Sequence, residues 1–373
     1  MEGPRPTRPE ELPSLARLVD TVFASGRAGT MFGSYPQLFN EPNLDNLLVF
    51  VDDGRVVSHV GMIQRWAGLA GCRVRVACVG SVSTYEEYRD RGLATGLFEA
   101  ACRKAKADGV DLMMISGGRG LYRRAGAADV GCDFVGQVGQ TAADLLCDDA
   151  VVLDECRALD VAACVEAYGA KRAHFIRPES DWLGLLEARK CMGRHVRFVV
   201  ARRGGVFCGY FIVADTNDKG ARQVIEFAGR DNDVAGALKP LMASCEADTL
   251  KVRLQAGDAA LKSLCEHAGV AFEAVNALGS LLVLNFSQLM QRLRPFFEAQ
   301  AGIEATRTLV FDQEGDAFRQ DDRFVFAADD GSRRLDRVAA AQFIFGQVHG
   351  EPPGGLWARL FPVPTLWYGI NYV

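Results

Sequence analysis

The sequence contains no run of eighteen apolar residues and no run of five or six like charges. The first absence argues against a membrane-spanning helix. The second, with a formal net charge of −5, argues against an arm that binds nucleic acid. The N-terminal segment has acidic residues and prolines where a signal peptide needs an apolar run. We therefore expect a cytoplasmic protein whose partners include neither nucleic acid nor a membrane.

Common metal and nucleophile motifs are also absent. The eleven cysteines form no C-x-x-C pair, and the five histidines form no H-x-x-x-H and lie beside no cysteine at ligand spacing. There is no G-x-x-x-x-G-K-[ST], no G-x-S-x-G and no H-E-x-x-H. We expect reduced cysteines in the core and no metal site.

What the chain does have is ordinary globular composition. Hydrophobic residues make up 49% of the 373 residues and charged residues 24%. A chain of this length can bury more than one core, so we expect two or three domains.

The first part of the chain alternates helical and strand patterns. A helical pattern runs from Pro9 to Phe23, and two β-rich segments then flank Asp53-Gly54, a strong hairpin turn. A third strand, CRVRVACVGSVST, leads into a helix that begins at Gly92 and ends at Gly109. With a strand DLMMIS, a short helix LYRRA and a last strand DFVGQVGQTAADL, the expected order is αβββαβαβ.

The same order recurs after residue 147, which indicates an internal duplication. The remainder, from about Ser287, reads as a small domain of helices and short strands. The sequence therefore predicts an α/β fold with mixed sheets and three domains, at residues 1–146, 147–286 and 287–373.

The segment Arg89-Asp90-Arg91-Gly92-Leu93-Ala94 joins a strand to a helix. Free N–H groups at a helix N-terminus favour an anion, and glycine lets the backbone approach phosphate oxygens. The two arginines add charged donors. This part of the sequence is typical of a pyrophosphate-binding loop.

The second copy of this loop has different residues. Asp233 stands at the position of Gly92, and Asn232 stands at the position of Arg91. A pyrophosphate would be repelled there, so we expect the second copy to be structural or to form one wall of the acceptor pocket.

The segment VSTYEEYRDRGLATGLFEAA resembles motif A of the GNAT N-acetyltransferases, and LYRRAGA resembles their motif B. The layout of the whole chain is similar to that of the Eis-type acetyltransferases. The resemblance implies two tandem GNAT folds, the second degenerate, and a C-terminal domain like a sterol carrier protein. It is strong at the level of motifs only from Val79 to Gly126.

The resemblance implies that acetyl-CoA, or coenzyme A, is bound by the first copy. The pantetheine arm would lie along the end of the third strand, and the pyrophosphate would lie on the loop. The implied binding residues are Val82, Ser83, Thr84, Arg89, Asp90, Arg91, Gly92, Leu93, Ala94 and Thr95.

The resemblance also suggests catalytic groups. Tyr122 matches the general acid of the Eis-type enzymes, and a tyrosine hydroxyl ordinarily keeps its proton at neutral pH. The aromatic C-terminal segment should pack against the protein, and in the family the terminal carboxylate, here on Val373, acts as the base. Glu86, Glu87 and His59 remain alternative bases.

We thus expect an acyl-CoA-dependent N-acyltransferase that acts on a small-molecule or peptide amine. A non-catalytic acyl-CoA-binding or regulatory protein on the same fold is the alternative. The family forms homo-oligomers, although nothing in these residues specifies an interface.

Overall fold

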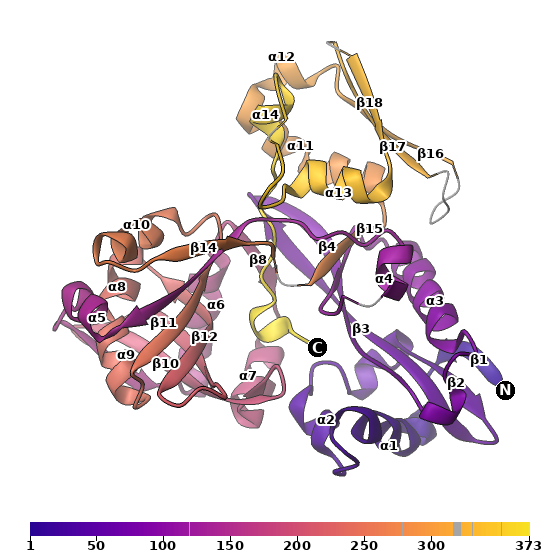
Figure 1. Ribbon diagram of the computed structural model, residues 1–373, viewed down its shortest axis with the longest axis horizontal. Coiled ribbons are helices and arrows are strands. Elements are labelled where there is room, and N and C mark those ends of the chain that lie inside the picture. Colours follow the sequence, from indigo (N-terminus) through magenta and orange to yellow (C-terminus); the bar gives the residue numbers. More distant parts are fainter. Residues whose placement is uncertain (119, 278, 316–321, 330, 352) are drawn as a thin grey trace. The chain divides into compact units, whose positions relative to one another are not determined.

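The computed structural model describes residues 1–118, 120–277, 279–315, 322–329, 331–351 and 353–373 (Figure 1). The chain divides into two compact units, and each is described by itself. The first comprises residues 1–130, 278–363 and 371–373, and the second comprises residues 131–277 and 364–370. The sheets include antiparallel and parallel pairs, which confirms the predicted mixed α/β class. The three-domain boundaries stay a prediction.

The sheet of the first unit has the strand order β1-β2-β3-β4-β5-β15. Its pairs are antiparallel except for β4 and β5, which are parallel. The strand bounds are β1 Glu2–Pro6, β2 Leu47–Asp52, β3 Arg55–Leu69, β4 Cys72–Thr84, β5 Leu112–Ile115 and β15 Ser280–Val283. Asp53 and Gly54, with φ angles of 46° and 74°, form the predicted hairpin turn between β2 and β3.

Strand β4 changes direction near its end. The β3–β4 ladder shifts register because two residues, Ser81 and Val82, lie opposite Val60 alone. Ser81 takes a φ of 57°, which is uncommon for a residue with a side chain. Such a bulge bends a strand and re-aims its side chains. Beyond it, β4 no longer pairs with β5.

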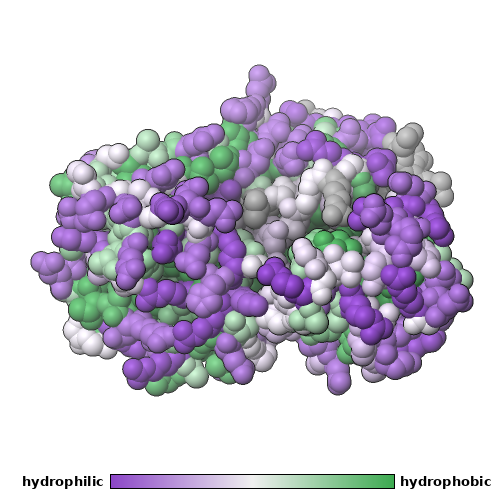
Figure 2. All heavy atoms as spheres, turned by 60° about the horizontal axis from the view of Figure 1, so that its bottom comes forward, coloured by the Kyte–Doolittle hydropathy of each residue, from purple (hydrophilic) through white to green (hydrophobic). Residues whose placement is uncertain are grey.

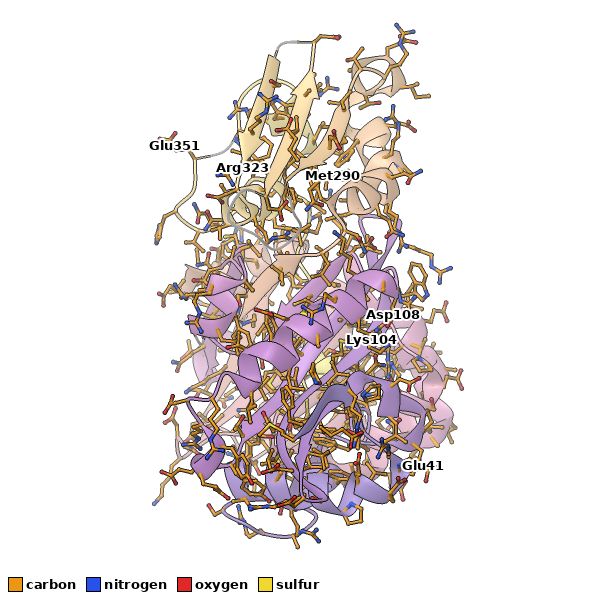
Figure 3. All side chains as sticks on the ribbon, turned by 90° about the vertical axis from the view of Figure 1, so that its right-hand side faces the viewer. Glu41, Lys104, Asp108, Met290, Arg323 and Glu351 are labelled. Atoms are coloured by element: carbon orange, nitrogen blue, oxygen red, sulfur yellow. The ribbon has the colours of Figure 1, made fainter. Side chains whose placement is uncertain are left out.

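The predicted long helix is α3, Leu93–Ala107. Its apolar face packs on β3 and β4, with Leu97 and Ala101 fully buried. Gly109 ends it with a φ of 77°. At this end Lys104 and Asp108 lie one turn apart and form an ion pair of 2.6 Å (Figure 3).

Of the other helices before residue 130, α1 is long and the rest are short. Their bounds are α1 Leu12–Phe23, α2 Thr30–Ser34 and α4 Gly120–Arg124, with 3-10 turns η1 Pro9–Glu11, η2 Glu41–Asn46 and η3 Glu86–Tyr88. Asp20, at 2% exposure, accepts hydrogen bonds from the amides of Gly29 and Met31, so that α1 fixes the start of α2.

The last part of the first unit has its own three-stranded antiparallel sheet. Its elements are α11 Phe286–Ala301, α12 Ile303–Thr306, β16 Val310–Glu314, β17 Arg323–Ala328, β18 Gly331–Leu335, α13 Arg337–Phe345 and α14 Trp357–Leu360. Aromatic rings fill its core, with Phe297 and Phe326 fully buried. Helices and short strands were expected here, and the likeness to a sterol carrier protein stays a prediction.

The sheet of the second unit has the order β14-β6-β13-β12-β11-β10-β7. The strand bounds are β6 Asp133–Gly139, β7 Val151–Glu155, β9 Lys190–Cys191, β10 Arg194–Arg203, β11 Val206–Asp215, β12 Ala221–Gly229, β13 Thr249–Leu254 and β14 Phe272–Val275. The short strand β8, Ala173–Ile176, is not part of this sheet. The helix bounds are α5 Gln140–Leu146, α6 Val161–Gly169, α7 Glu179–Ala188, α8 Asp231–Gly236, α9 Leu238–Ser244 and α10 Ala259–His267, with one 3-10 turn, η4 Ala158–Asp160. Of these strands, β12 and β13 form a parallel pair.

One strand lies in a different sheet from the one expected. The segment DFVGQVGQTAADL was expected to be the last strand of the first repeat. Its first seven residues are β6, which pairs with β13 and β14 in the second unit, whereas QTAADL belongs to helix α5. The strand next to β5 in the first unit is instead β15. Alternating residues predict a strand but do not specify its partner, because pairing depends on distant parts of the chain. The prediction was therefore right that β6 is a strand, and wrong about its sheet and about the residues that follow it.

In the part of the chain that the structure describes, no helix combines the length and apolar character needed to cross a bilayer. On the face drawn in Figure 2, hydrophilic side chains cover most of the surface, and hydrophobic ones form small separate patches.

The aromatic core around α11 supports a stability prediction. Phe297→Ala should leave a cavity against Phe311 and Phe361 and lower the free energy of unfolding by about 3–5 kcal/mol. Ile303→Ala, at a side chain that is 69% exposed, should change it by less than about 1 kcal/mol. Urea denaturation of both variants checks this, and equal effects would contradict the assignment of the core.

Candidate functional site

The segment from Arg89 to Gly92 joins β4 to α3. Gly92 is the N-cap residue of α3, and its φ of 75° lies in the left-handed region that favours glycine. The first amide bonded within the helix is that of Gly96, which donates to the Gly92 carbonyl at 2.9 Å. The amides of Leu93, Ala94 and Thr95 belong to the first turn, where no helical acceptor exists. They form a concentrated set of donors with the positive end of the helix dipole behind them.

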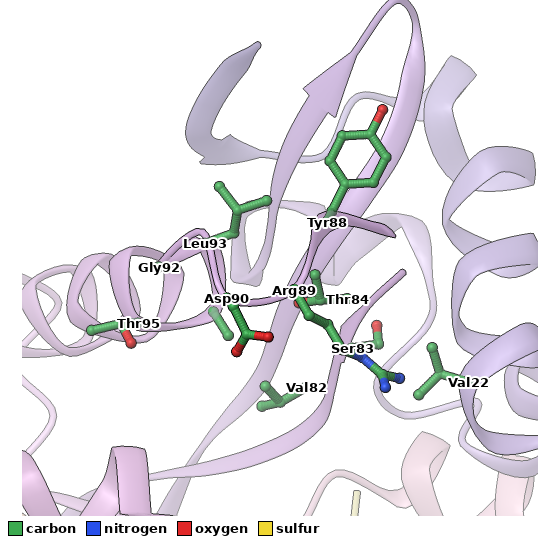
Figure 4. A pocket seen from close by; sticks show the side chains of 11 residues that line it. Val22, Val82, Ser83, Thr84, Tyr88, Arg89, Asp90, Gly92, Leu93 and Thr95 are labelled. Atoms are coloured by element: carbon green, nitrogen blue, oxygen red, sulfur yellow. The ribbon is translucent and has the colours of Figure 1, made fainter. Parts of the chain in front are cut away.

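A cavity of 500 Å³ opens at this helix start (Figure 4). It is lined by Val22, Val82, Ser83, Thr84, Tyr88, Arg89, Asp90, Gly92, Leu93, Ala94 and Thr95. The Arg89 side chain extends past Ser83 toward Val22. The structure thus brings together nine of the ten expected cofactor-binding residues, and their roles stay a prediction.

Arg91 is the tenth residue and does not line the cavity. Its Nη2 donates to the Glu87 carbonyl oxygen at 2.7 Å, and its guanidinium lies 4.9 Å from the centre of the Tyr88 ring. A guanidinium held there does not line the cavity, but it can add positive charge near its opening.

Two lining residues were not expected from the sequence. Tyr88 precedes the loop, and its hydroxyl donates to Asp52 at 2.9 Å, which connects the loop to β2. Val22 comes from α1 and reaches the cavity only through the fold. Tyr88 could have been suggested from the sequence because it directly precedes the loop. No sequence pattern indicates that Val22 lines the cavity.

Tyr122 lies on α4 with 4% exposure. Its ring packs edge-on against Phe98 of α3 with centroids 5.1 Å apart, and it belongs to the same buried cluster as Val82 and Ile115. Val82 follows the divergence of β4, and Ile115 ends β5. The tyrosine is therefore buried in the same cluster as the end of β5 and the part of β4 that extends beyond their pairing.

The last residues of the sequence are buried in the first unit. The Gln37 side-chain amide donates to the Tyr372 carbonyl at 3.1 Å, and Val373 is 5% exposed. A Cβ at Gly80 would collide with the main-chain carboxyl carbon and oxygen of Val373. Val373 therefore packs directly against the backbone of Gly80 in β4, immediately before the bulge, where a residue with a side chain would leave no room for it.

The alternative bases lie in contrasting surroundings. Glu86 and Glu87 are exposed on η3, and Glu87 pairs with Arg55 at 3.0 Å. His59 is fully buried, with Nδ1 3.1 Å from the Leu48 carbonyl oxygen. Burial lowers the pKa of His59 to about 3, so the imidazole is neutral at physiological pH and a poor proton acceptor. His59 is therefore not a base tuned to neutral pH.

In the corresponding loop of the second unit, a buried aspartate stands at the start of the helix. Asp233 lies in the first turn of α8 with 3% exposure. Its carboxylate accepts hydrogen bonds from Arg203 at 2.7 Å and from Arg230 at 2.9 Å. A carboxylate therefore already pairs with the arginines at this helix start.

The described ranges of the chain contain no group of three or more His, Cys, Asp or Glu that could hold a metal ion. All eleven cysteines are free thiols, and most are buried.

Residues 4–129 match the family described as the acetyltransferase (GNAT) domain. The match covers this part of the chain alone. The match includes β4, the loop, α3 and Tyr122. A search of curated proteins found no match to the chain.

Solved structures with a similar fold cover most of the chain. A GCN5-related N-acetyltransferase from Anabaena variabilis has a TM-score of 0.62 at 14% identity, over 89% of this chain and 84% of that one. One from Kribbella flavida has a TM-score of 0.61 at 19% identity, over 90% and 88%. Eis1 from Mycobacterium abscessus has a TM-score of 0.59 at 16% identity, over 92% and 89%. At these levels of sequence identity, the similarity to the solved structures shows only that this chain has the same fold.

The contact between Gly80 and Val373 can be tested with one methyl group. Gly80→Ala should displace residues 371–373 and raise the exchange rate of their amide hydrogens at least about tenfold, because the added carbon would occupy the place of the Val373 carboxyl group. Hydrogen–deuterium exchange with mass spectrometry measures this. Gly96→Ala, where a Cβ meets only ordinary contacts with Phe50, is the matched control. Unchanged exchange in Gly80→Ala would refute the placement.

Proposed function

We propose that this protein is an acyl-CoA-dependent N-acyltransferase that uses acetyl-CoA and a primary amine. The observation that carries the proposal is the open cavity at the start of α3, which combines free helix amides, Gly92 and Arg89. A pyrophosphate is an anion suited to these donors. The GNAT family match over the same residues supports the assignment.

The residues present fit the two parts of coenzyme A. The helix start and Arg89 would hold the pyrophosphate, and Arg91 would add positive charge at the mouth. The pantetheine arm would lie along Val82 to Thr84, on the end of β4 that extends beyond the pairing with β5. The bulge at Ser81 separates this stretch from the part of β4 that pairs with β5.

Acyl transfer to an amine requires a base for the amine proton, donors for the developing oxyanion and an acid for the departing thiolate. We assign the acid to Tyr122, which belongs to the same buried cluster as Val82. We assign the base to the terminal carboxylate of Val373, which lies on Gly80 of the same strand. Backbone amides at the end of β4 would polarise the acyl carbonyl.

The other candidate bases have weaker support. His59 is held neutral by burial, and Glu86 and Glu87 are exposed to water on η3. We propose a small-molecule or peptide amine as the acceptor and the cytoplasm as the location. The cysteines, which are free thiols throughout, suit a reducing compartment.

Binding of acetyl-CoA is the first test. Calorimetry should give a Kd on the order of micromolar for the wild type, and at least about hundredfold weaker binding for Arg91→Glu/Gly92→Asp, because this variant adds two negative charges and removes a cation where the pyrophosphate lies. Asn232→Glu changes the aligned position of the second loop and should leave the affinity within about twofold.

The outcomes separate the candidate functions. A folded wild type that does not bind acetyl-CoA would overturn the acyltransferase proposal. Binding without transfer to any amine of a broad panel would instead support a non-catalytic acyl-CoA-binding protein on this fold. Equal losses in the Asn232→Glu control would show that the effect is not specific to the first loop.

The general acid has a separate kinetic test. Tyr122→Phe removes only the hydroxyl and should lower kcat about hundredfold, while the Kd for acetyl-CoA changes less than about twofold. Steady-state kinetics and calorimetry measure the two quantities. An unchanged kcat would leave Tyr122 as a packing residue against Phe98.

A further inference from the structure

One face of the β3–β4 hairpin carries two glycines and two polar residues. His59 and Gly61 lie two residues apart on β3, and a Cβ at Gly61 would come within 2.9 Å of His59 Nε2, so both residues point to the same face. On β4, Ser83 is the ladder partner of His59, and Gly80 is the ladder partner of Gly61. Directly opposed residues of an antiparallel pair share one face. All four residues therefore belong to the same face of the sheet.

The carboxyl group of Val373 lies on this face as well. The place that a Cβ of Gly80 would take is filled by the carboxyl carbon and oxygen of Val373, and residues 371–373 belong to the same unit as the hairpin. The ladder partners of Gly80 and Ser83 are two residues apart on β3, which places these two positions of β4 about 6.5 Å apart. The carboxyl group and the Ser83 side chain are therefore neighbours on one face.

The hydroxyl group of Ser83 is buried without a partner. Ser83 is 2% exposed, and within the described residues its Oγ makes no hydrogen bond. Buried hydroxyl groups are rarely left in this state, because the loss of hydration is not compensated. Ser83 also lines the cavity at the start of α3, together with Val22 of α1 (Figure 4). A molecule bound in this cavity can supply the missing hydrogen bond.

The two faces of β4 differ in the groups that the proposed function assigns to them. Val82 precedes Ser83 and so points to the opposite face, where it belongs to the same buried cluster as Tyr122, the acid for the thiolate. Ser83 shares its face with the carboxyl group of Val373, the base for the amine. The amine must reach its base, so it is expected on the face of Ser83.

We propose that the Ser83 hydroxyl positions the acceptor amine and makes the site selective for primary over secondary amines. This inference rests on the proposed function, in which the Val373 carboxylate is the base. One N–H of the bound amine donates to this carboxylate, and a second N–H donates to Ser83 Oγ. Each hydrogen bond spans about 3 Å, so one nitrogen atom can bridge two acceptors about 6 Å apart.

This arrangement leaves the nitrogen lone pair directed at the acyl group. The lone pair forms the bond to the acyl carbon, and the bond from that carbon to sulfur breaks. The Val373 carboxylate takes the proton that the amine loses, and Tyr122 gives its proton to the thiolate. His59, which burial keeps neutral, does not compete with the amine for the carboxylate as a cation. A secondary amine has a single N–H, so it can donate to Val373 but not also to Ser83.

The test uses Ser83→Ala, which removes only the hydroxyl group. This group makes no hydrogen bond within the described residues, so the variant should melt within about 2 °C of the wild type. Thr21→Ala is the matched control, because its hydroxyl is exposed on α1 and donates to the Arg17 carbonyl at 2.7 Å. The probes are two matched pairs of amines. They are benzylamine with N-methylbenzylamine, and Nα-acetyl-lysine with its Nε-methyl derivative.

Steady-state kinetics and calorimetry give the expected result. In Ser83→Ala, kcat/KM for the primary amines should fall at least about fivefold, as expected when one hydrogen bond to the reacting amine is lost. For the N-methyl amines kcat/KM should stay within twofold of the wild type or rise, and the Kd for acetyl-CoA should stay within twofold. Thr21→Ala should leave all of these quantities within twofold.

Other outcomes separate this inference from the proposed function. Equal losses for primary and N-methyl amines, or no loss for either, would overturn the role of Ser83 while the acyltransferase proposal stands. A Kd for acetyl-CoA that rises at least tenfold in Ser83→Ala would assign the hydroxyl to the coenzyme and would also overturn the inference. If the wild type binds no acetyl-CoA, or acetylates no amine, the proposed function fails and this inference falls with it.

Discussion

Strand β4 continues beyond its parallel partner β5, and the candidate site depends on that difference in length. Pairing stops at Val79, the bulge at Ser81 bends the strand away, and the following residues reach the start of α3 without a neighbour from β5. Tyr122 belongs to the same buried cluster as Val82, which lies beyond the end of this pairing. A continuous parallel ladder would have paired this end of β4 with β5 and left no opening between the strands.

Much of this was readable from the sequence because the signals are local. The turn at Asp53-Gly54, the helix with its N-cap at Gly92 and its end at Gly109, and the loop residues that line the cavity are all specified by a few neighbouring residues. The bulge at Ser81 was not predicted, since a non-glycine residue with positive φ leaves no clear pattern in a run of strand formers.

The features that the sequence did not reveal depend on contacts between distant segments. Strand β6 was assigned to the wrong sheet because its alternation fits any antiparallel neighbour. Val22 lines the cavity only because α1 packs against the sheet. Gly80 contacts Val373 at the far end of the chain, and neither residue carries a motif that would link them.

The ion pairs of Asp233 bear on which residues the loop of the second unit tolerates. Exchanging this aspartate for glycine, the residue of the first loop, would remove the carboxylate that Arg203 and Arg230 now share, although Arg203 would keep its pair with Asp148. Such a substitution would thus carry a cost before it opened this helix start to an anion. The charges of the loop are therefore coupled, and a new binding role here would require several of them to change together.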